Sequence, residues 1–456
     1  MFCKFCGKQI PDDSRTCEHC GKELRAPEVA SKKPLTKLRN SQLAIILVAV
    51  VVCVALVTAV AVIGFQALNP GSGTQATTPP TTPPDGNPDD VSCKGTYTAE
   101  ESELLAALDT VVATIGDATL TNKQLQVYYW MQFYDFYEEY YYYATSMGLN
   151  PAQSLDTQLS MFSAGEDTGS ITWQQYFLTC ALESWRRNQT LSQLAAAEGF
   201  TLPVQYQESL DKIEETLLAS AKEQDMDSVQ QLLIHDMGAG ATIEAYKDYL
   251  QTYYMGYLYF AEQVDKIRVP ESDVEMYYKE NQESLNKSGV SKESADKVID
   301  VRHILIKPVG DTEDAKTFTD AQWEAARVEA QRIRDLWLAG DADEDSFAQL
   351  ANEYTQDPGS KYTGGLYTNV AKGKMVTEFN DWIFDESREY GNYGLIKTTY
   401  GYHIMFFVES TPAWYATCES EVINQRSQTL LEQLLGDAKV DVTYGNIVLG
   451  NVDLAE

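Results

Sequence analysis

A run of 23 residues without a charged side chain, Leu43 to Phe65, constrains this chain of 456 residues more than any other feature. A helix rises about 1.5 Å per residue, so this run would be about 34 Å long and would cross a hydrocarbon core of about 30 Å. The run is too long for the apolar part of a signal peptide and follows a 42-residue leader, which favours an uncleaved anchor. We therefore expect one transmembrane helix over residues 43–65.

Charge is distributed unevenly on the two sides of this run. Residues 1–40 carry nine Lys or Arg against five Asp or Glu, whereas the rest of the chain carries 26 against 62. The basic segment 26–42 lies directly before the apolar run, so the positive-inside rule predicts a single-pass protein of the cell membrane with its N-terminus in the cytoplasm. The strongly acidic C-terminal part would then be extracellular, and its charge argues against nucleic acid as a partner.

The first 25 residues contain two CxxC pairs, formed by Cys3 with Cys6 and by Cys17 with Cys20. Each pair lets two thiolates converge on one metal, and two pairs complete a closed tetrahedral zinc site. The segment 1–25 resembles a small zinc ribbon, which implies a structural Zn²⁺ with no open position for a substrate. A redox role for one CxxC pair is the weaker alternative, and any partner of the ribbon would be cytoplasmic.

The residues after the apolar run predict a linker followed by a mainly helical region. Residues 66–92 are rich in Thr and Pro and predict an extended spacer. The range 93–299 reads as mostly helical, and residues 410–456 supply a final amphipathic helix. Three further cysteines, Cys93, Cys180 and Cys418, allow at most one disulfide within the chain.

The helical region opens with a predicted hairpin over residues 111–120, with Gly116 and Asp117 at its turn. Thr121 and Gln124 then have the spacing of a capping box. The helix that follows, residues 124–143, is unusually rich in Tyr, Trp and Phe. Two interpretations remain open at about even weight: a packed core, or a groove that binds varied partners.

Two of the four histidines lie in matching apolar runs, at His303 and His403, and each run reads as a buried strand. Helical spacing between the runs predicts an α+β unit, with Asp320 as the N-cap of its first helix. The ordered set of motifs includes Phe347 to Ala351, Asp357-Pro358-Gly359-Ser360, Gly364-Gly365, Lys372 to Met375, Phe379 and Lys397 to Tyr400. Residues 300–409 thereby resemble the parvulin family of peptidyl-prolyl cis/trans isomerases.

The resemblance implies roles for particular side chains. His303, His403 and Thr398 match the family's polar floor, and Asp357 matches a position beside the substrate carbonyl. Met375 and Phe379 match the apolar cup for the proline ring. Tyr367 and Val370 stand where a leucine and a phenylalanine are expected near that cup, so the cup's shape departs from the family pattern.

The flanking helical segments resemble the chaperone part of PrsA-type and SurA-type foldases, in which a parvulin domain is inserted. This implies a membrane-anchored foldase that needs no cofactor for isomerisation and acts on unfolded or partly folded secreted proteins with Xaa-Pro bonds. The alternative is a holdase whose parvulin domain has lost activity and serves only for binding. A membrane-tethered sensor ranks last, because a flexible spacer transmits shape poorly.

Overall fold

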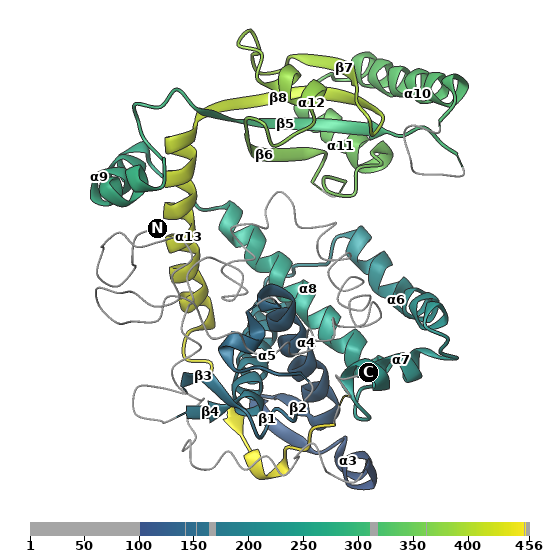
Figure 1. The fold of residues 1–456 in the computed structure, drawn as a ribbon, viewed down its shortest axis with the longest axis vertical. Coiled ribbons are helices and arrows are strands. Elements are labelled where there is room, and N and C mark those ends of the chain that lie inside the picture. Colours follow the sequence, from purple (N-terminus) through teal and green to yellow (C-terminus); the bar gives the residue numbers. More distant parts are fainter. Residues whose placement is uncertain are drawn as a thin grey trace, which may run out of the picture.

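The computed structural model describes residues 101–450 and Val452, except Tyr142, Ala152, Tyr362 and the ranges 164–169 and 311–317. The predicted ribbon, basic segment, membrane span and linker lie outside the described residues. Among the residues that are described, no helix is both long enough and apolar enough to cross a membrane. The described chain forms a helical region and a sheet region, joined on one side by two helices, α9 and α13 (Figure 1).

The helical region is built on three long helices that pack on one another, α4 (Asn122–Tyr140), α5 (Trp173–Ala197) and α8 (Ile243–Asp265). Its other helical elements are α3 (Glu101–Ala107), η2 (Ala144–Met147), α6 (Val204–Glu223), α7 (Val229–Met237) and α9 (Glu271–Lys287). Two hairpins complete it: β1 (Val111–Ile115) with β2 (Ala118–Thr121), and β3 (Leu159–Ser163) with β4 (Ser170–Thr172).

The predicted hairpin and capping box are confirmed. Ile115 pairs with Ala118, and Gly116 has the positive φ of 55° that this tight turn requires. The Gln124 side chain accepts a hydrogen bond of 2.9 Å from the backbone N–H of Thr121, which is the N-cap of α4. The hairpin therefore leads straight into the helix.

The aromatic side chains of α4 form a core. Seven of them are at most 9% exposed: Tyr128, Tyr129, Trp130, Phe133, Tyr134, Phe136 and Tyr137. They pack mainly on one another and on rings of α5; Phe133 stacks on Tyr137 at 5.7 Å, and Phe136 meets Phe177 at 5.6 Å. The core interpretation is confirmed, and a groove lined by these seven rings is wrong, because each ring is already covered by another ring or by a neighbouring helix.

The C-terminal part of the chain returns to the helical region. The long helix α13 (Ala413–Leu435) packs on α5, α8 and α9. A two-residue strand, β9 (Asp441–Val442), then pairs with β1, and a 3₁₀ turn, η3 (Tyr444–Asn446), follows. The helix was expected from its apolar spacing, but β9 was not, since two residues carry no detectable period.

The sheet region consists of one antiparallel sheet in the order β6-β5-β8-β7, covered by helices on both faces (Figure 1). Its elements are β5 (Lys297–Ile306), α10 (Asp320–Ala339), α11 (Glu344–Tyr354), β6 (Leu366–Ala371), α12 (Thr377–Ile383), β7 (Tyr393–Lys397) and β8 (Tyr402–Pro412). The expected α+β architecture is present. Strand β6 was missed, and Thr319 rather than Asp320 caps α10, since its hydroxyl accepts from the Gln322 N–H.

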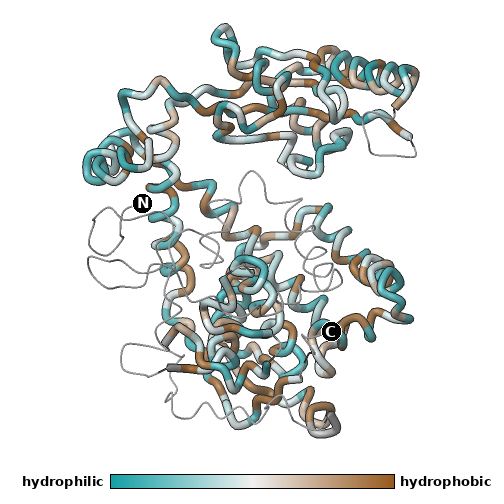
Figure 2. The backbone as a smooth tube through the Cα atoms, viewed as in Figure 1, coloured by the Kyte–Doolittle hydropathy of each residue, from teal (hydrophilic) through white to brown (hydrophobic). Residues whose placement is uncertain are grey.

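The two faces of the sheet have different apolar clusters. On one face, Ile304 and Ile404 share a cluster with Trp337 of α10 and Phe347 of α11. The opposite face holds Val301, Met405 and Phe407 with Phe379 and Ile383 of α12. Figure 2 shows hydrophobic stretches along the sheet strands and mostly hydrophilic residues along α10, as expected for a helix with one buried stripe.

Candidate functional site

The two predicted histidines lie on neighbouring central strands of the sheet, on the α12 face. His303 of β5 is opposite Met405, and His403 of β8 is opposite Leu305. Directly paired residues share a face, and so do residues two apart along a strand, so both imidazoles point the same way. Their Nδ1 atoms are 3.1 Å apart, and the two residues are only 1% and 4% exposed.

Hydrogen bonds extend this pair into a polar chain of four side chains. The Thr398 hydroxyl lies 2.9 Å from His403 Nε2, and His303 Nε2 lies 3.2 Å from Asp357 Oδ2. Thr398 Oγ1 also accepts from the Tyr400 N–H, so its own proton is free to donate to His403. His403 Nδ1–H then donates to His303 Nδ1, and His303 Nε2–H donates to the carboxylate. One arrangement of protons satisfies each of these contacts.

The electrostatics agree with that arrangement. Burial, with a smaller effect of nearby His303, lowers the pKa of His403 to about 3, so its ring stays neutral at ordinary pH. Burial alone would raise the pKa of Asp357, but hydrogen bonds and charge from His303, together with the Ser360 and Tyr367 hydroxyls, hold it well below the usual range. The polar chain therefore ends in the ionised carboxylate of Asp357, whose side chain is 15% exposed.

Ser360 belongs to this site, although sequence reasoning assigned it no role. It is fully buried, its hydroxyl donates a 2.6 Å hydrogen bond to Asp357 Oδ2, and its Oγ lies 3.1 Å from His303 Nε2. The available signal was the turn Asp357-Pro358-Gly359-Ser360, because an Asp that opens a turn is brought close to the side chain three residues later.

Gly365 allows the loop after Ser360 to lie directly against β5. Its carbonyl accepts a 2.8 Å hydrogen bond from the His303 N–H. A Cβ at this position would lie 2.3 Å from the His303 carbonyl oxygen, and the φ of 74° is one that L side chains rarely adopt. The second glycine of the Gly-Gly motif thus supports the backbone beneath the first histidine.

The apolar residues predicted for the cup lie beside the histidines. The Phe379 ring meets the His303 ring at 5.3 Å and the His403 ring at 5.5 Å, both nearly edge to face. Phe379 and Val370 are buried in one cluster against which the half-buried Met375 packs. The structure brings these three predicted cup residues together on the α12 face.

Tyr367 is positioned differently from the other predicted cup residues. Its ring stacks on His303 at 4.9 Å, and its hydroxyl donates a 2.8 Å hydrogen bond to Asp357 Oδ2. Burial, followed by the charge of Asp357 and this hydrogen bond, raises the pKa of Tyr367 above its ordinary value, so the hydroxyl remains a donor. Tyr367 therefore joins the polar chain as well as the edge of the apolar cluster.

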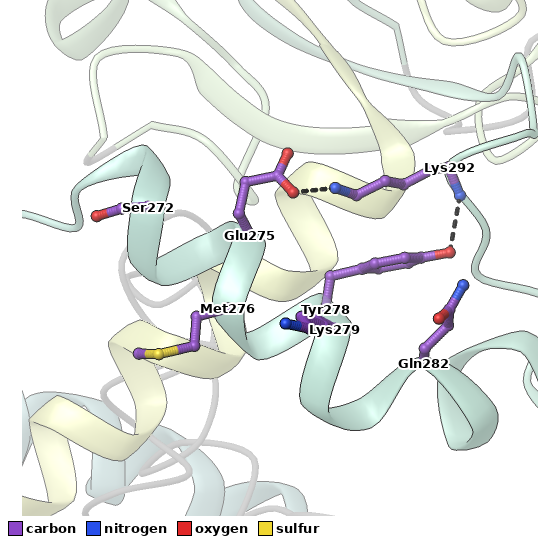
Figure 3. Close-up of a pocket in the computed structure, with 7 residues that line it drawn as sticks. All are labelled: Ser272, Glu275, Met276, Tyr278, Lys279, Gln282 and Lys292. Atoms are coloured by element: carbon purple, nitrogen blue, oxygen red, sulfur yellow. Dashed lines mark hydrogen bonds and ion pairs between the residues drawn. The ribbon is translucent and has the colours of Figure 1, made fainter.

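A separate pocket of about 470 Å³ lies along α9, lined by residues that include Glu275, Tyr278 and Lys292 (Figure 3). Lys292 pairs with Glu275 and lies over the rings of Tyr278 and Trp414. The pocket contains none of the predicted site residues. In the described residues no three His, Cys, Asp or Glu side chains are grouped to hold a metal; the four ribbon cysteines lie outside them.

Comparison with family models identifies two segments. Residues 284–411 match the PPIC-type peptidyl-prolyl isomerase domain, and residues 2–24 match a zinc-ribbon domain. The segment that carries the polar chain is thus a parvulin-type peptidyl-prolyl isomerase domain, which confirms the prediction from its motifs.

Similar whole proteins include foldases and chaperones. The chain is 26% identical to "Foldase protein PrsA" of Halalkalibacterium halodurans over 54% of this chain and 65% of that one, and 29% identical to "Chaperone SurA" of Pseudomonas savastanoi over 32% and 33%. The match thus spans less than two thirds of the length of either relative. The crystal structure of PrsA from Bacillus subtilis is 22% identical, covers 61% of this chain and 92% of that one, and has a TM-score of 0.29.

Proposed function

We propose that this protein is a membrane-anchored foldase that catalyses cis/trans isomerisation of Xaa-Pro bonds in unfolded or partly folded secreted or surface proteins. The observation that carries the proposal is the polar chain from Thr398 to Asp357, which lies against the Phe379 ring inside a segment that matches an isomerase domain. Support for the anchor and for the extracellular side comes from the apolar run 43–65 and the basic residues before it.

The chemistry requires no covalent step. An Xaa-Pro bond rotates over a barrier of about 18–20 kcal/mol because resonance places double-bond character in the C–N bond and negative charge on the carbonyl oxygen. A site lowers the barrier by favouring the twisted amide over the planar one. An ionised carboxylate beside the carbonyl oxygen opposes the charge-separated planar form, and an apolar cup that excludes water removes the solvent that stabilises it.

Each residue then has a physical task. Asp357 supplies the negative charge, and its partially exposed side chain keeps access to a bound peptide. The rings of His303 and His403, held by Thr398, fix the position of that carboxylate and act neither as nucleophiles nor as acids. Phe379, with Met375, would hold the proline ring so that only one side of the bond turns.

The test is an exchange-rate measurement on Xaa-Pro peptides with the full-length protein and two charge-matched variants. We expect Asp357→Asn to lower kcat/KM by about 10- to 100-fold, the range found when one preorganised electrostatic group is lost. Asp381→Asn removes the same charge from an exposed position on α12 and should leave the rate unchanged. Exchange that the wild-type protein does not accelerate would refute catalysis and favour the holdase alternative.

A chaperone activity is proposed from the names of the relatives and from the surface of α13. Half-buried apolar side chains on this helix, Ile423, Leu430, Leu431 and Leu434, pack at the edge of a cluster shared with α5 and α8. The α4 rings are core residues, so they are not the client surface. We expect Asp357→Asn to suppress aggregation of an unfolding client as well as wild type does, and Leu431→Asp to suppress it less. Equal protection by all three proteins would contradict the α13 assignment.

We further propose that the N-terminal ribbon holds one structural Zn²⁺. The donor set fits, because Cys3, Cys6, Cys17 and Cys20 provide four thiolates, as many as a closed tetrahedral site takes. Metal analysis of the full-length protein should give one equivalent of zinc, lost when Cys17 and Cys20 are changed to Ser. A disulfide between Cys3 and Cys6 in material from the cytoplasmic side would contradict the proposal.

A further inference from the structure

We propose that Tyr367 is a positioning residue of the isomerase site, which holds the Asp357 carboxylate and the His303 ring in register with each other, and that it is not a wall of the proline cup. This inference rests on the proposed function, and it assigns to this chain a role that the residue type expected at this position, a leucine, cannot perform.

The first argument is that Tyr367 touches two members of the polar chain at once. Its hydroxyl is 2.8 Å from Asp357 Oδ2, and its ring lies 4.9 Å from the His303 ring with an interplanar angle of 26°. Those two partners are themselves 3.2 Å apart. Three groups therefore form a closed triangle, in which neither the carboxylate nor the imidazole can turn without breaking a contact to Tyr367.

The surrounding backbone is shaped to accept the hydroxyl. Strand β6 pairs with β5 so that Tyr367 is opposite Val301, two residues before His303. Gly359, in the turn that carries Asp357, leaves the space that the hydroxyl occupies, since a Cβ there would lie 2.9 Å from the Tyr367 oxygen. A tyrosine at 367 and a glycine at 359 are thus complementary.

The second argument is electrostatic. Three donors converge on Asp357 Oδ2: the Tyr367 hydroxyl, the Ser360 hydroxyl and His303 Nε2–H. The titratable groups that face the carboxylate are His303 of β5, Tyr367 of β6 and, through His303, His403 of β8. Since hydrogen bonds to the charged form stabilise it, removing the tyrosine hydroxyl should raise the pKa of Asp357.

Val370 offers the matched contrast. It was predicted together with Tyr367 as a cup residue, and it lies three residues further along β6, buried in the apolar cluster with Phe379. It makes no polar contact through its side chain, which has no polar atom. A cup residue and a positioning residue can therefore be compared on one strand.

The experiment uses the full-length protein with Tyr367→Phe, which keeps the ring and loses the hydroxyl, and Val370→Ala as the comparison. Two readouts are needed. One is the pH profile of kcat and KM for an Xaa-Pro peptide. The other is NMR titration of histidine-labelled protein, which has only four histidines, so the His303 ring reports the ionisation of its neighbour Asp357 without requiring activity.

For Tyr367→Phe we expect kcat to fall about tenfold with KM nearly unchanged, and the acid titration seen at His303 to move up by about one to two pH units, the equivalent of one hydrogen bond to a charged group. Val370→Ala should raise KM and leave the titration in place. An unchanged titration and kcat in Tyr367→Phe would overturn the positioning role while leaving the enzyme intact. A shifted titration in a protein without isomerase activity would retain the contact but refute the proposed function on which its catalytic meaning rests.

Discussion

The aromatic cluster of α4 and the polar chain of the sheet, which contains His303 and His403, look equally unusual in the sequence. They differ in whether their polar side-chain atoms hydrogen-bond to one another. In α4 the rings mainly meet rings, and the Tyr137 hydroxyl is buried without a partner among the described residues. In the sheet, the Thr398 hydroxyl, the four ring nitrogens of the two histidines and Asp357 Oδ2 each meet another polar atom of the polar chain. An unusual cluster of residues in the sequence therefore indicates a functional site only where its polar side chains form a connected hydrogen-bond network. Burial of polar groups without such partners is unfavourable.

The largest expected effect lies in the aromatic cluster. Trp130→Ala removes a fully buried side chain that packs on Tyr129, Phe133 and Tyr134, and we expect it to lower the free energy of unfolding by about 3–5 kcal/mol. Denaturant unfolding of the full-length protein measures this. If Trp130→Ala kept wild-type stability but no longer bound unfolded client proteins, the α4 cluster would be a binding site and not a core.

The next effect concerns pH and the polar chain. Because the pKa of His403 is lowered to about 3 in the folded protein, the unfolded chain binds a proton first as pH falls. This contribution to stability is complete above pH 6.5 and is lost as pH falls, by about 2–3 kcal/mol between pH 6.5 and 4.5. His403→Gln should lack this part of the pH dependence. Identical slopes for wild type and variant would show that the ring is not held neutral.

A smaller effect is expected at Thr398, which forms one end of the polar chain. Thr398→Val keeps the shape but leaves His403 Nε2 buried without its donor, which should lower stability by about 1–3 kcal/mol and reduce the isomerase rate. Thr399→Val changes the same residue type at an exposed neighbouring position and serves as the control. If the two variants behave alike in unfolding and exchange assays, the hydroxyl of Thr398 has no special role.

The smallest effect sharpens the contrast between the two clusters. Tyr137→Phe removes a buried hydroxyl that lacks a partner among the described residues, so we expect a stability change within about 1 kcal/mol, neutral or favourable. Denaturation curves of Tyr137→Phe and Thr398→Val, measured side by side, test the idea directly. A loss above that range for Tyr137→Phe would reveal a hydrogen bond that makes the α4 cluster more like the polar chain.

Much of the architecture could be predicted from residue patterns. The two histidine strands are long and apolar, the hairpin at 111–120 has a strong turn signal, and the α13 helix has a clear apolar stripe. The α4 rings could not be assigned, because aromatic residues suit both a core and a binding surface, and only the packing of α5 against them decides.

The sequence predicted which residues form the site better than it predicted the contacts between them. His303, His403, Thr398 and Asp357 do come together. The roles of Ser360 and Tyr367 depend on a turn and on the register of β6 against β5. Since the residue pattern does not predict β6 as a strand, neither its register nor the contact of Tyr367 with Asp357 could be derived.

The pairing of β1 with β9 has a consequence for the order in which the molecule is completed. The isomerase sheet closes entirely within residues 297–412, whereas the Asn122 amide binds the backbone of Asn446, 324 residues later. A chain that emerges N-terminus first can therefore finish its sheet while its helical region still waits for the last strand. The sheet that carries the proposed isomerase site can thus be complete while β1 still lacks its partner β9, so the site can form before the helical region is finished.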